Sequence, residues 1–143
     1  MIRRSTKTFI FAALVAFMTL SSGCATLSPG KEKDLLRDRV AQLMNAKIAG
    51  KWDLAYDFFD PDFRIRVLKK DFTSLQRKTV FKGFEIRKLE ILPSGKEARV
   101  EINNHISMMG YDLKNAPKVQ HWVKQDGQWY LKVKAHNTPF GNK

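Results

Sequence analysis

The sequence predicts an α+β fold in which helices come first and antiparallel strands follow. Apolar residues recur every three or four positions between Asp34 and Ile48, which is the spacing of an amphipathic helix. From Thr79 onward apolar and polar residues alternate, which is the period of a half-buried strand. Hydrophobic residues make up 43% and aromatic residues 11% of the chain, and this composition argues against a disordered polypeptide.

The helical part is predicted to contain two or three helices. The first ends at Gly50, and the second ends at Pro61 because a proline ring cannot continue a helix. A brief third helix is expected over residues 71–76. The apolar positions expected to face inward are Leu36, Val40, Leu43, Met44 and Ile48, then Trp52, Ala55, Tyr56 and Phe59, and finally Phe72 and Leu75. The opposite side of the second helix carries Asp53, Asp57 and Asp60.

Two long strands are predicted after the helices. Residues 80–92 alternate with a change of phase at Arg87-Lys88, which is typical of a β-bulge. A turn at residues 93–95 leads into a second strand over residues 98–108. Asn104 is the one polar residue on the apolar face of that strand, so we expect its side chain to point into the domain.

A hairpin is predicted near the end of the chain. Residues 109–118 are expected to form a loop, after which residues 119–124 pair with residues 128–135. Asp126-Gly127 lies between these two segments, and this dipeptide is one of the strongest short-range hairpin signals.

The register of this hairpin decides where His121 points. A two-residue turn would place His121 opposite Lys132 on the outside of the sheet. A three-residue turn would place His121 inside and bury a more consistent apolar set, so we favour it. The favoured register leaves Trp122 and Tyr130 exposed on the outer face of the sheet. This face could serve as the interface of a homodimer.

The start of the chain has the three parts of a secretory signal. A basic segment is followed by an apolar run from Phe9 to Leu20 and then by SSGC, which contains the sole cysteine, Cys24. The apolar run is shorter than the roughly 20 residues that cross a bilayer. A cysteine directly after small residues resembles the lipobox of bacterial lipoproteins, although Ser21 stands where that motif usually has leucine. The alternatives are a cleaved signal without lipid and an uncleaved anchor.

The lipobox resemblance implies a lipid-anchored protein of the cell envelope. Residues 1–23 would be the signal peptide, Cys24 would carry the lipid, residues 24–33 would form a short tether and residues 34–143 the folded domain. Each buried methylene contributes about 0.8 kcal/mol, so two or three acyl chains make a lasting anchor. The family's inner-membrane retention signal has aspartate where this chain has Ala25, and the resemblance therefore points to the periplasmic leaflet of the outer membrane.

Lipidation and charge narrow the possible functions. A lipidated Cys24 leaves no thiol for a disulfide, a thiolate metal site or a nucleophile. The net charge of +12 falls to +9 when the three cations of the signal are removed. Such a basic surface is either solubilising or suited to envelope polyanions such as lipid phosphates, and we expect no nucleic-acid partner.

Three stretches carry a resemblance to a known fold. They are GKWDLAYDFFDPDFR from Gly50 to Arg64, GKEARVEI from Gly95 to Ile102 and WVKQDGQWYLKV from Trp122 to Val133. In element order and apolar placement the domain resembles the nuclear transport factor 2-like superfamily. The resemblance implies two to three helices packed in a strongly curved, four-stranded antiparallel sheet, with a cavity at the open end of the cone. A cystatin-like fold, in which a sheet grips one helix, is the alternative.

Five residues are candidates for lining that cavity. They are Asn104, His121, Tyr56, Met108 and Trp129. A buried Asn104 amide must find hydrogen-bond partners, either in a ligand or in a neighbouring backbone. Tyr56 either presents its hydroxyl to the cavity or packs in the core. The histidines have no metal-type spacing, so we predict neither a metal site nor a cofactor.

The expected function is a non-catalytic binding module. The superfamily includes isomerases and dehydratases as well as domains that only bind, so function must be argued from residues. Acid–base catalysis requires a base in an apolar pocket, and His121 is the only inward base in the favoured register. We expect a module that binds a small apolar or amphiphilic ligand or an envelope partner. The alternative is a small-molecule isomerase or hydro-lyase with His121 as base and Asn104 or Tyr56 as donor.

Overall fold

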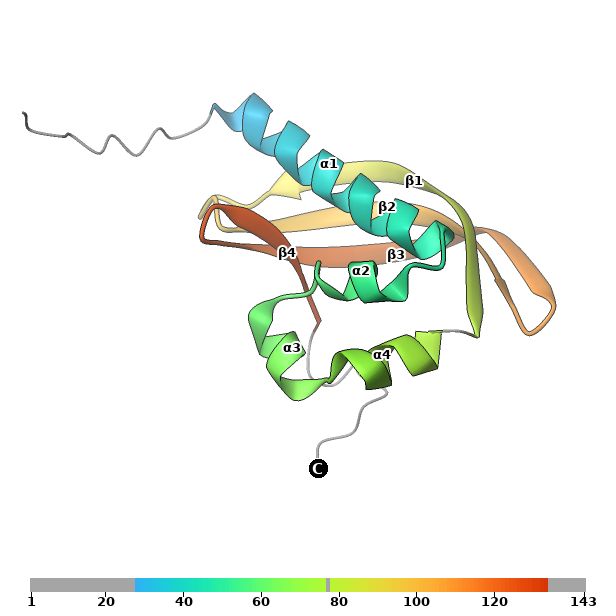
Figure 1. The fold of residues 1–143 in the computed structure, drawn as a ribbon. Helices are drawn as coiled ribbons and strands as arrows, with labels where there is room; N and C mark the ends of the chain where they lie inside the picture. The colour runs from blue at the N-terminus through green and yellow to red at the C-terminus, as the bar shows by residue number, and fades with distance from the viewer. Residues whose placement is uncertain (1–27, 77, 134–143) are drawn as a thin grey trace, which may run out of the picture.

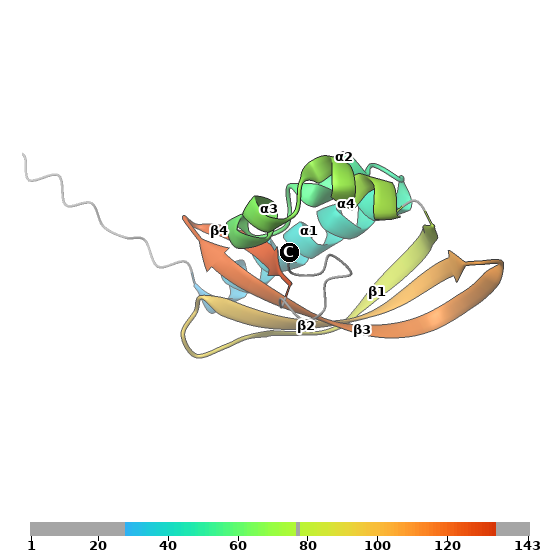
Figure 2. The same ribbon diagram turned by 90° about the horizontal axis from the view of Figure 1, so that it is seen from below.

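The computed structural model describes residues 28–76 and 78–133, which form one α+β domain (Figure 1). The helices are α1 (Pro29–Ile48), α2 (Trp52–Tyr56), α3 (Pro61–Arg66) and α4 (Lys69–Gln76), and the strands are β1 (Thr79–Ile91), β2 (Glu97–Met108), β3 (Tyr111–Gln125) and β4 (Gln128–Lys132). The strands form one antiparallel sheet in the order β1-β2-β3-β4. Figure 2 shows the helices on one face of a curved sheet. The predicted α+β class and its four-stranded antiparallel sheet are confirmed.

Helix α1 supplies a large part of the core. The predicted stripe of Leu36, Val40, Leu43 and Met44 is fully buried, whereas Ile48 in the last turn is exposed. The helix begins at Pro29, earlier than the expected Asp34, because proline at the first helical position needs no hydrogen-bond donor. Gly50 follows with a φ of +67°, a left-handed conformation that ends the helix as predicted.

Pro61 begins a helix and does not end one, so the predicted second helix is in fact two. Helix α2 stops at Tyr56, and Pro61 occupies the first turn of α3. Asp60 caps α3, since its Oδ1 accepts a hydrogen bond from the Phe63 N–H at 3.0 Å. Asp60 was expected on the outer side of a longer helix, but this capping role buries it.

An aromatic cluster joins the three short helices. The Phe59 and Phe63 rings stack with centroids 4.6 Å apart, and Phe72 from α4 meets Phe59 edge-on at 5.0 Å. Phe72 is buried as predicted, whereas Leu75 is exposed. Helices of five to eight residues are not stable by themselves, and packing in this cluster explains why they form here.

The first two strands pair as the alternation predicts. A register shift lies between Ile86 and Lys88, which confirms the predicted bulge, and a second shift lies between Phe81 and Gly83. The inward residues of β2 are Ala98, Val100, Ile102 and Asn104, all of them buried. Bulges bend a strand and increase its twist, so the two shifts contribute to the curvature of the sheet over the helices.

Strand β3 is longer than predicted. The expected loop over residues 109–118 is a tight turn at Met109-Gly110 followed by strand, and Tyr111 already pairs with Met108. Pro117 misled the prediction because proline lacks the donor for a sheet hydrogen bond. Among the described strands β4 pairs only with His121–Gln125, so Pro117 lies where β3 has a neighbour on one side only. Such an edge tolerates proline.

The favoured hairpin register is wrong. Asp126 and Gly127 have φ values of 50° and 77°, the two left-handed residues of a two-residue turn. His121 therefore pairs with Lys132 and Trp122 with Leu131. The side chain of Trp122 is turned inward and is 1% exposed, so it cannot form the predicted homodimer face, and His121 is exposed. A two-residue turn of this type matches the twist of the flanking strands. This preference determined the register, although the other register would bury a more consistent set of apolar residues.

The core lies wholly within the predicted folded domain, residues 34–143. The cluster of buried residues extends from Leu36 to Leu131. Residues 28–143 therefore retain every core contact that the structure describes, and we expect this segment to fold by itself. The predicted signal peptide and residues 24–27 of the predicted tether, Cys24 among them, lie outside the described residues. Residues 29–33 of that tether belong to α1, so the folded domain begins earlier than predicted. Among the described helices none is long and apolar enough to cross a membrane.

Candidate functional site

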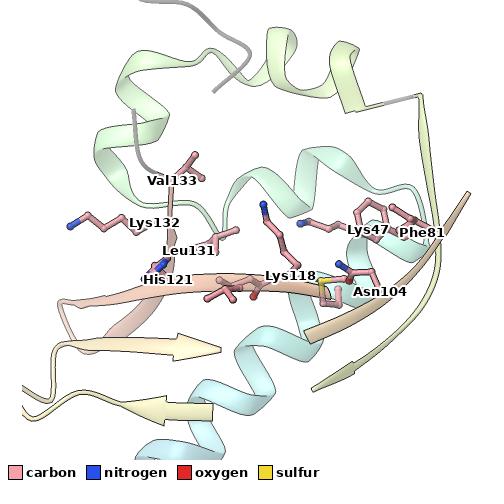
Figure 3. A pocket seen from close by; sticks show the side chains of 12 residues that line it. Lys47, Phe81, Asn104, Lys118, His121, Leu131, Lys132 and Val133 are labelled. Atoms are coloured by element: carbon pink, nitrogen blue, oxygen red, sulfur yellow. Dashed lines mark hydrogen bonds between the residues drawn. The ribbon is translucent and has the colours of Figure 1, made fainter. Parts of the chain in front are cut away.

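A cavity of about 420 Å³ opens between α1 and the sheet. Its volume lies within the range of roughly 300–1,000 Å³ that is typical of small-molecule sites. Apolar side chains from four elements and the residue after β4 form much of the wall, namely Met44, Phe81, Ile106, Leu131 and Val133. Polar residues complete the lining, and Figure 3 shows Lys47, Lys118 and Asn104 on the same side of it.

Asn104 is a buried residue of the cavity lining, and its burial on the inner face of β2 was predicted. Its neighbours on the adjacent strands are Phe84 on β1 and Ala116 on β3, neither of which has a polar side chain. Only 7% of the residue is exposed, and Oδ1 has no hydrogen-bond partner in the part of the chain that the structure describes. A buried carbonyl oxygen without a partner is costly, so the site is suited to a ligand or water that donates to it.

Two lysines that the sequence analysis did not select meet at the cavity. Lys47 is in the last turn of α1, and its Nζ lies 5.4 Å from the centroid of the Phe81 ring. Lys118 pairs with Ile102 across the sheet and points to the same space (Figure 3). Burial, and then the positive charge of Lys118, lower the pKa of Lys47 to about 8.

A sequence signal for Lys47 existed. Lys47 follows Leu43 by four positions and Met44 by three, so it continues the apolar stripe that the spacing defines. Lys118 carries no such signal, because the sequence predicts a loop over residues 109–118. Only the true length of β3 sets Lys118 in the same phase as the inward Gln120 and Trp122.

Gln120 also lines the cavity, and both ends of its amide have a partner. Its Oε1 accepts a hydrogen bond from Trp122 Nε1 at 2.9 Å, and its Nε2 lies 3.7 Å from Met44 Sδ. The amide thus gives the inward Trp122 the partner that a buried indole N–H requires. Gln120 therefore fixes α1 against β3 and contrasts with Asn104, whose oxygen has no described partner.

Tyr56 belongs to the core and not to the cavity. Its hydroxyl lies 2.6 Å from the carbonyl oxygen of Val67 and 3.0 Å from that of Arg64. These contacts tie α2 to the carboxyl end of α3, and burial raises the pKa of the phenol. The alternative of core packing is the one that the structure supports.

The remaining predicted site residues occupy different places. Met108 is 43% exposed at the end of β2 and is not part of the lining, which corrects its predicted inward position. Trp129 is buried in the core, where Arg39 Nε donates to its carbonyl oxygen, and it too is absent from the lining. His121 is exposed and forms part of the cavity's edge. The structure thus brings Asn104 and His121 to the cavity but not Tyr56, Met108 or Trp129.

The charged groups around the cavity are of one sign. Among the described residues its lining contains Lys47, Lys118 and Lys132 but neither aspartate nor glutamate. Within the described residues no group of three His, Cys, Asp or Glu side chains could hold a metal ion. The arrangement can therefore attract an anion, and it offers no carboxylate pair for acid–base chemistry.

Comparisons with known proteins identify the fold alone. No family model matches the sequence, and no curated protein matches it. A crystal structure of a SEC-C motif containing protein from Psychrobacter arcticus is similar with a TM-score of 0.58 and 15% identity, over 71% of this chain and 60% of that one. The chain thus spans less than two thirds of the length of this protein.

Two further solved structures are similar over more of their own length. A SEC-C motif containing protein from Rhodopseudomonas palustris has a TM-score of 0.54 and 18% identity, over 69% of this chain and 73% of that one. A domain of unknown function from Nostoc punctiforme, described as having a cystatin-like fold, has a TM-score of 0.53 and 11% identity. The similarity covers 73% of this chain and 75% of that one. The last likeness agrees with the alternative fold that the sequence suggested.

Proposed function

We propose that this protein is a lipid-anchored module of the cell envelope that binds a small amphiphilic ligand without transforming it. The cavity of about 420 Å³ between α1 and the sheet carries the proposal. Its wall combines apolar side chains with a few convergent polar groups, which is the usual make-up of a small-molecule site. An amphiphile fits this lining because one part of it can bury apolar surface while another meets the amide of Asn104 and the lysines.

We assign the domain to the nuclear transport factor 2-like type of cone as part of this proposal. Three short helices accompany α1 on the concave face, which supports a cone more than a single helix gripped by a sheet. The two bulges in β1 supply the bend that such a cone requires.

A fluorescent apolar probe tests the binding function. Residues 28–143 are titrated with phenylnaphthylamine, whose emission rises when it leaves water, and we expect a saturable increase. Ile106→Trp fills the cavity and should abolish the increase, whereas Val80→Trp on the exposed surface of β1 should leave it intact. If the probe does not saturate, or if both variants bind it equally, the cavity is not a ligand site.

The anchor has its own test. The proposal requires Cys24 to carry the lipid, because it is the only cysteine of the chain. Cells that express the full chain should incorporate labelled palmitate into it, and Cys24→Ser should remove the label. Label that persists in Cys24→Ser would refute lipidation at this residue and, with it, the proposed tether to the outer membrane.

The isomerase or hydro-lyase alternative has lost its main support. It needed His121 as a buried base, but His121 pairs with Lys132 and is exposed to water. The hydroxyl of Tyr56, its other candidate donor, is engaged by the Val67 carbonyl oxygen. No second observation on the described residues favours catalysis, so binding is the function that we propose.

A further inference from the structure

The chemistry of the cavity narrows the class of ligand. Lys47 projects from α1 and Lys118 from β3, so two cations from different elements face one space (Figure 3). In the part of the chain that the structure describes, neither lysine forms an ion pair. Other lysines of the sheet are paired, as Lys88 is with Glu90 and Lys124 with Glu32. The cavity therefore holds positive charge that the described residues do not neutralise.

Keeping Lys47 protonated at this position costs free energy. Lys47 is only partly exposed, and its ammonium has lost water without gaining a carboxylate. The nearby Lys118 adds repulsion, and burial with this repulsion lowers the pKa of Lys47 to about 8. An anion between the two ammonium groups would offset both costs, since it pairs with each of them.

Asn104 is a third group turned to the same space. Its amide carries one acceptor and two donors, and its Oδ1 has no described hydrogen-bond partner. A carboxylate or phosphate head group could accept from the amide nitrogen while pairing with the lysines. The unpartnered oxygen is an observation independent of the lysine charges, and it requires a donor. A singly protonated phosphate or a water molecule bridging to a carboxylate can supply that donor while the head group pairs with the lysines.

The rest of the wall is apolar. Phe81 and Ile106 lie on the β1–β2 side, and Leu131 and Val133 lie at the β4 end. A bare inorganic anion would leave this surface in contact with water, whereas an alkyl chain buries it at about 25 cal/mol per Å². The lining thus favours a molecule with an anionic end and a hydrocarbon end.

We infer that the ligand is a single-chain amphiphile with an anionic head group, held at its head by Lys47, Lys118 and Asn104 and at its chain by the apolar wall. This inference rests on the proposed binding function and adds the charge of the ligand to it. A fatty acid and an alkyl phosphate share this chemistry, and the experiment below separates them.

Calorimetric titration of residues 28–143 tests the inference with three probes of equal chain length: decanoate, decyl phosphate and decanol. We expect at least one anion to bind about tenfold or more tightly than the neutral alcohol, a difference of ~1.4 kcal/mol. The tighter of the two anions then indicates whether the head group is a carboxylate or a phosphate.

Matched variants locate the charge effect. Lys47→Met and Lys118→Met should each lower the affinity for the anion about tenfold while leaving the affinity for decanol unchanged. Lys88→Met removes an exposed lysine outside the cavity and should change neither affinity. The urea midpoint of every variant shows that it remains folded.

The unfavourable outcomes are distinguishable. If decanol binds as tightly as both anions, or if neither lysine variant weakens the anion, the anionic class is wrong and the binding function stands. If none of the three probes binds, both this inference and the proposed binding function fail.

Discussion

The ammonium of Lys47 lies 5.4 Å from the centroid of the Phe81 ring, so a cation from the end of α1 faces an aromatic side chain of β1. Such a contact contributes about 0.5–1 kcal/mol at accessible sites. It does not offset the loss of water, because the pKa of Lys47 falls from 10.5 to about 8. The protonated lysine therefore destabilises the free protein, and a ligand can recover that free energy.

Lys47→Met should stabilise the domain in a pH-dependent manner. The pKa of Lys47 is about 8 in the folded protein and 10.5 in the unfolded chain. Between these two pH values the unfolded chain therefore binds more protons than the folded protein. As a result, the free energy of unfolding of the wild type rises with pH in this range. Below pH 8 we expect the methionine variant to be more stable by on the order of 1–3 kcal/mol. This gap should shrink toward pH 10.5.

Urea unfolding of wild type and Lys47→Met at pH 7 and pH 10 measures this difference in stability. The other titrating groups are the same in the two proteins, so their contributions cancel in the difference. Lys88→Met, which removes an exposed lysine paired with Glu90, should show no comparable change with pH. A Lys47→Met variant that is less stable than wild type at pH 7 would contradict the assigned cost of the buried charge.

Asn104→Leu should raise stability and lower anion affinity. The substitution removes a buried oxygen that has no described partner and fills the same space with an apolar side chain, for a gain of about 1 kcal/mol. It also removes the amide that faces the head group. Thermal unfolding and decanoate titration measure the two effects. Asn103→Leu, on the opposite face of β2, serves as the control and should leave decanoate affinity unchanged.

Tyr56→Phe should cost stability without affecting binding. The variant leaves the Val67 and Arg64 carbonyl oxygens without this donor, at a cost of about 1–2 kcal/mol. Tyr130→Phe removes an exposed hydroxyl that contacts Gln128 and should cost little. Urea midpoints and decanoate affinities of the two variants are the measurements, and a weaker affinity of Tyr56→Phe would return Tyr56 to the site.

Gly127→Ala tests the two-residue turn. Gly127 has a φ of +77°, which a side chain adopts at a cost of about 1–2 kcal/mol. Gly30→Ala is the control, since Gly30 lies in α1 with space around it and should gain about 0.5–1 kcal/mol. Denaturation midpoints should therefore move in opposite directions. No loss in Gly127→Ala would argue for a different turn and would reopen the inward register of His121.

The sequence predicted the features that depend on neighbouring residues. The stripe of Leu36 to Met44, the bulge near Arg87 and the burial of Asn104 all follow from local periodicity, and the structure agrees with each. The turn at Asp126-Gly127 was also predicted, but its length was not. One extra residue in a turn reverses which face each side chain meets, so this single choice misplaced His121 and Trp122 together.

The chain by itself determined an α+β class, a sheet of four strands and one polar residue on an apolar face. These features follow from the spacing of apolar residues within short segments. Only the tertiary structure decided which charges meet at the cavity. Lys47 and Lys118 are far apart in the chain, and they face one space because α1 crosses the sheet and β3 extends through Pro117. Their shared environment is a property of packing, which no local pattern contains.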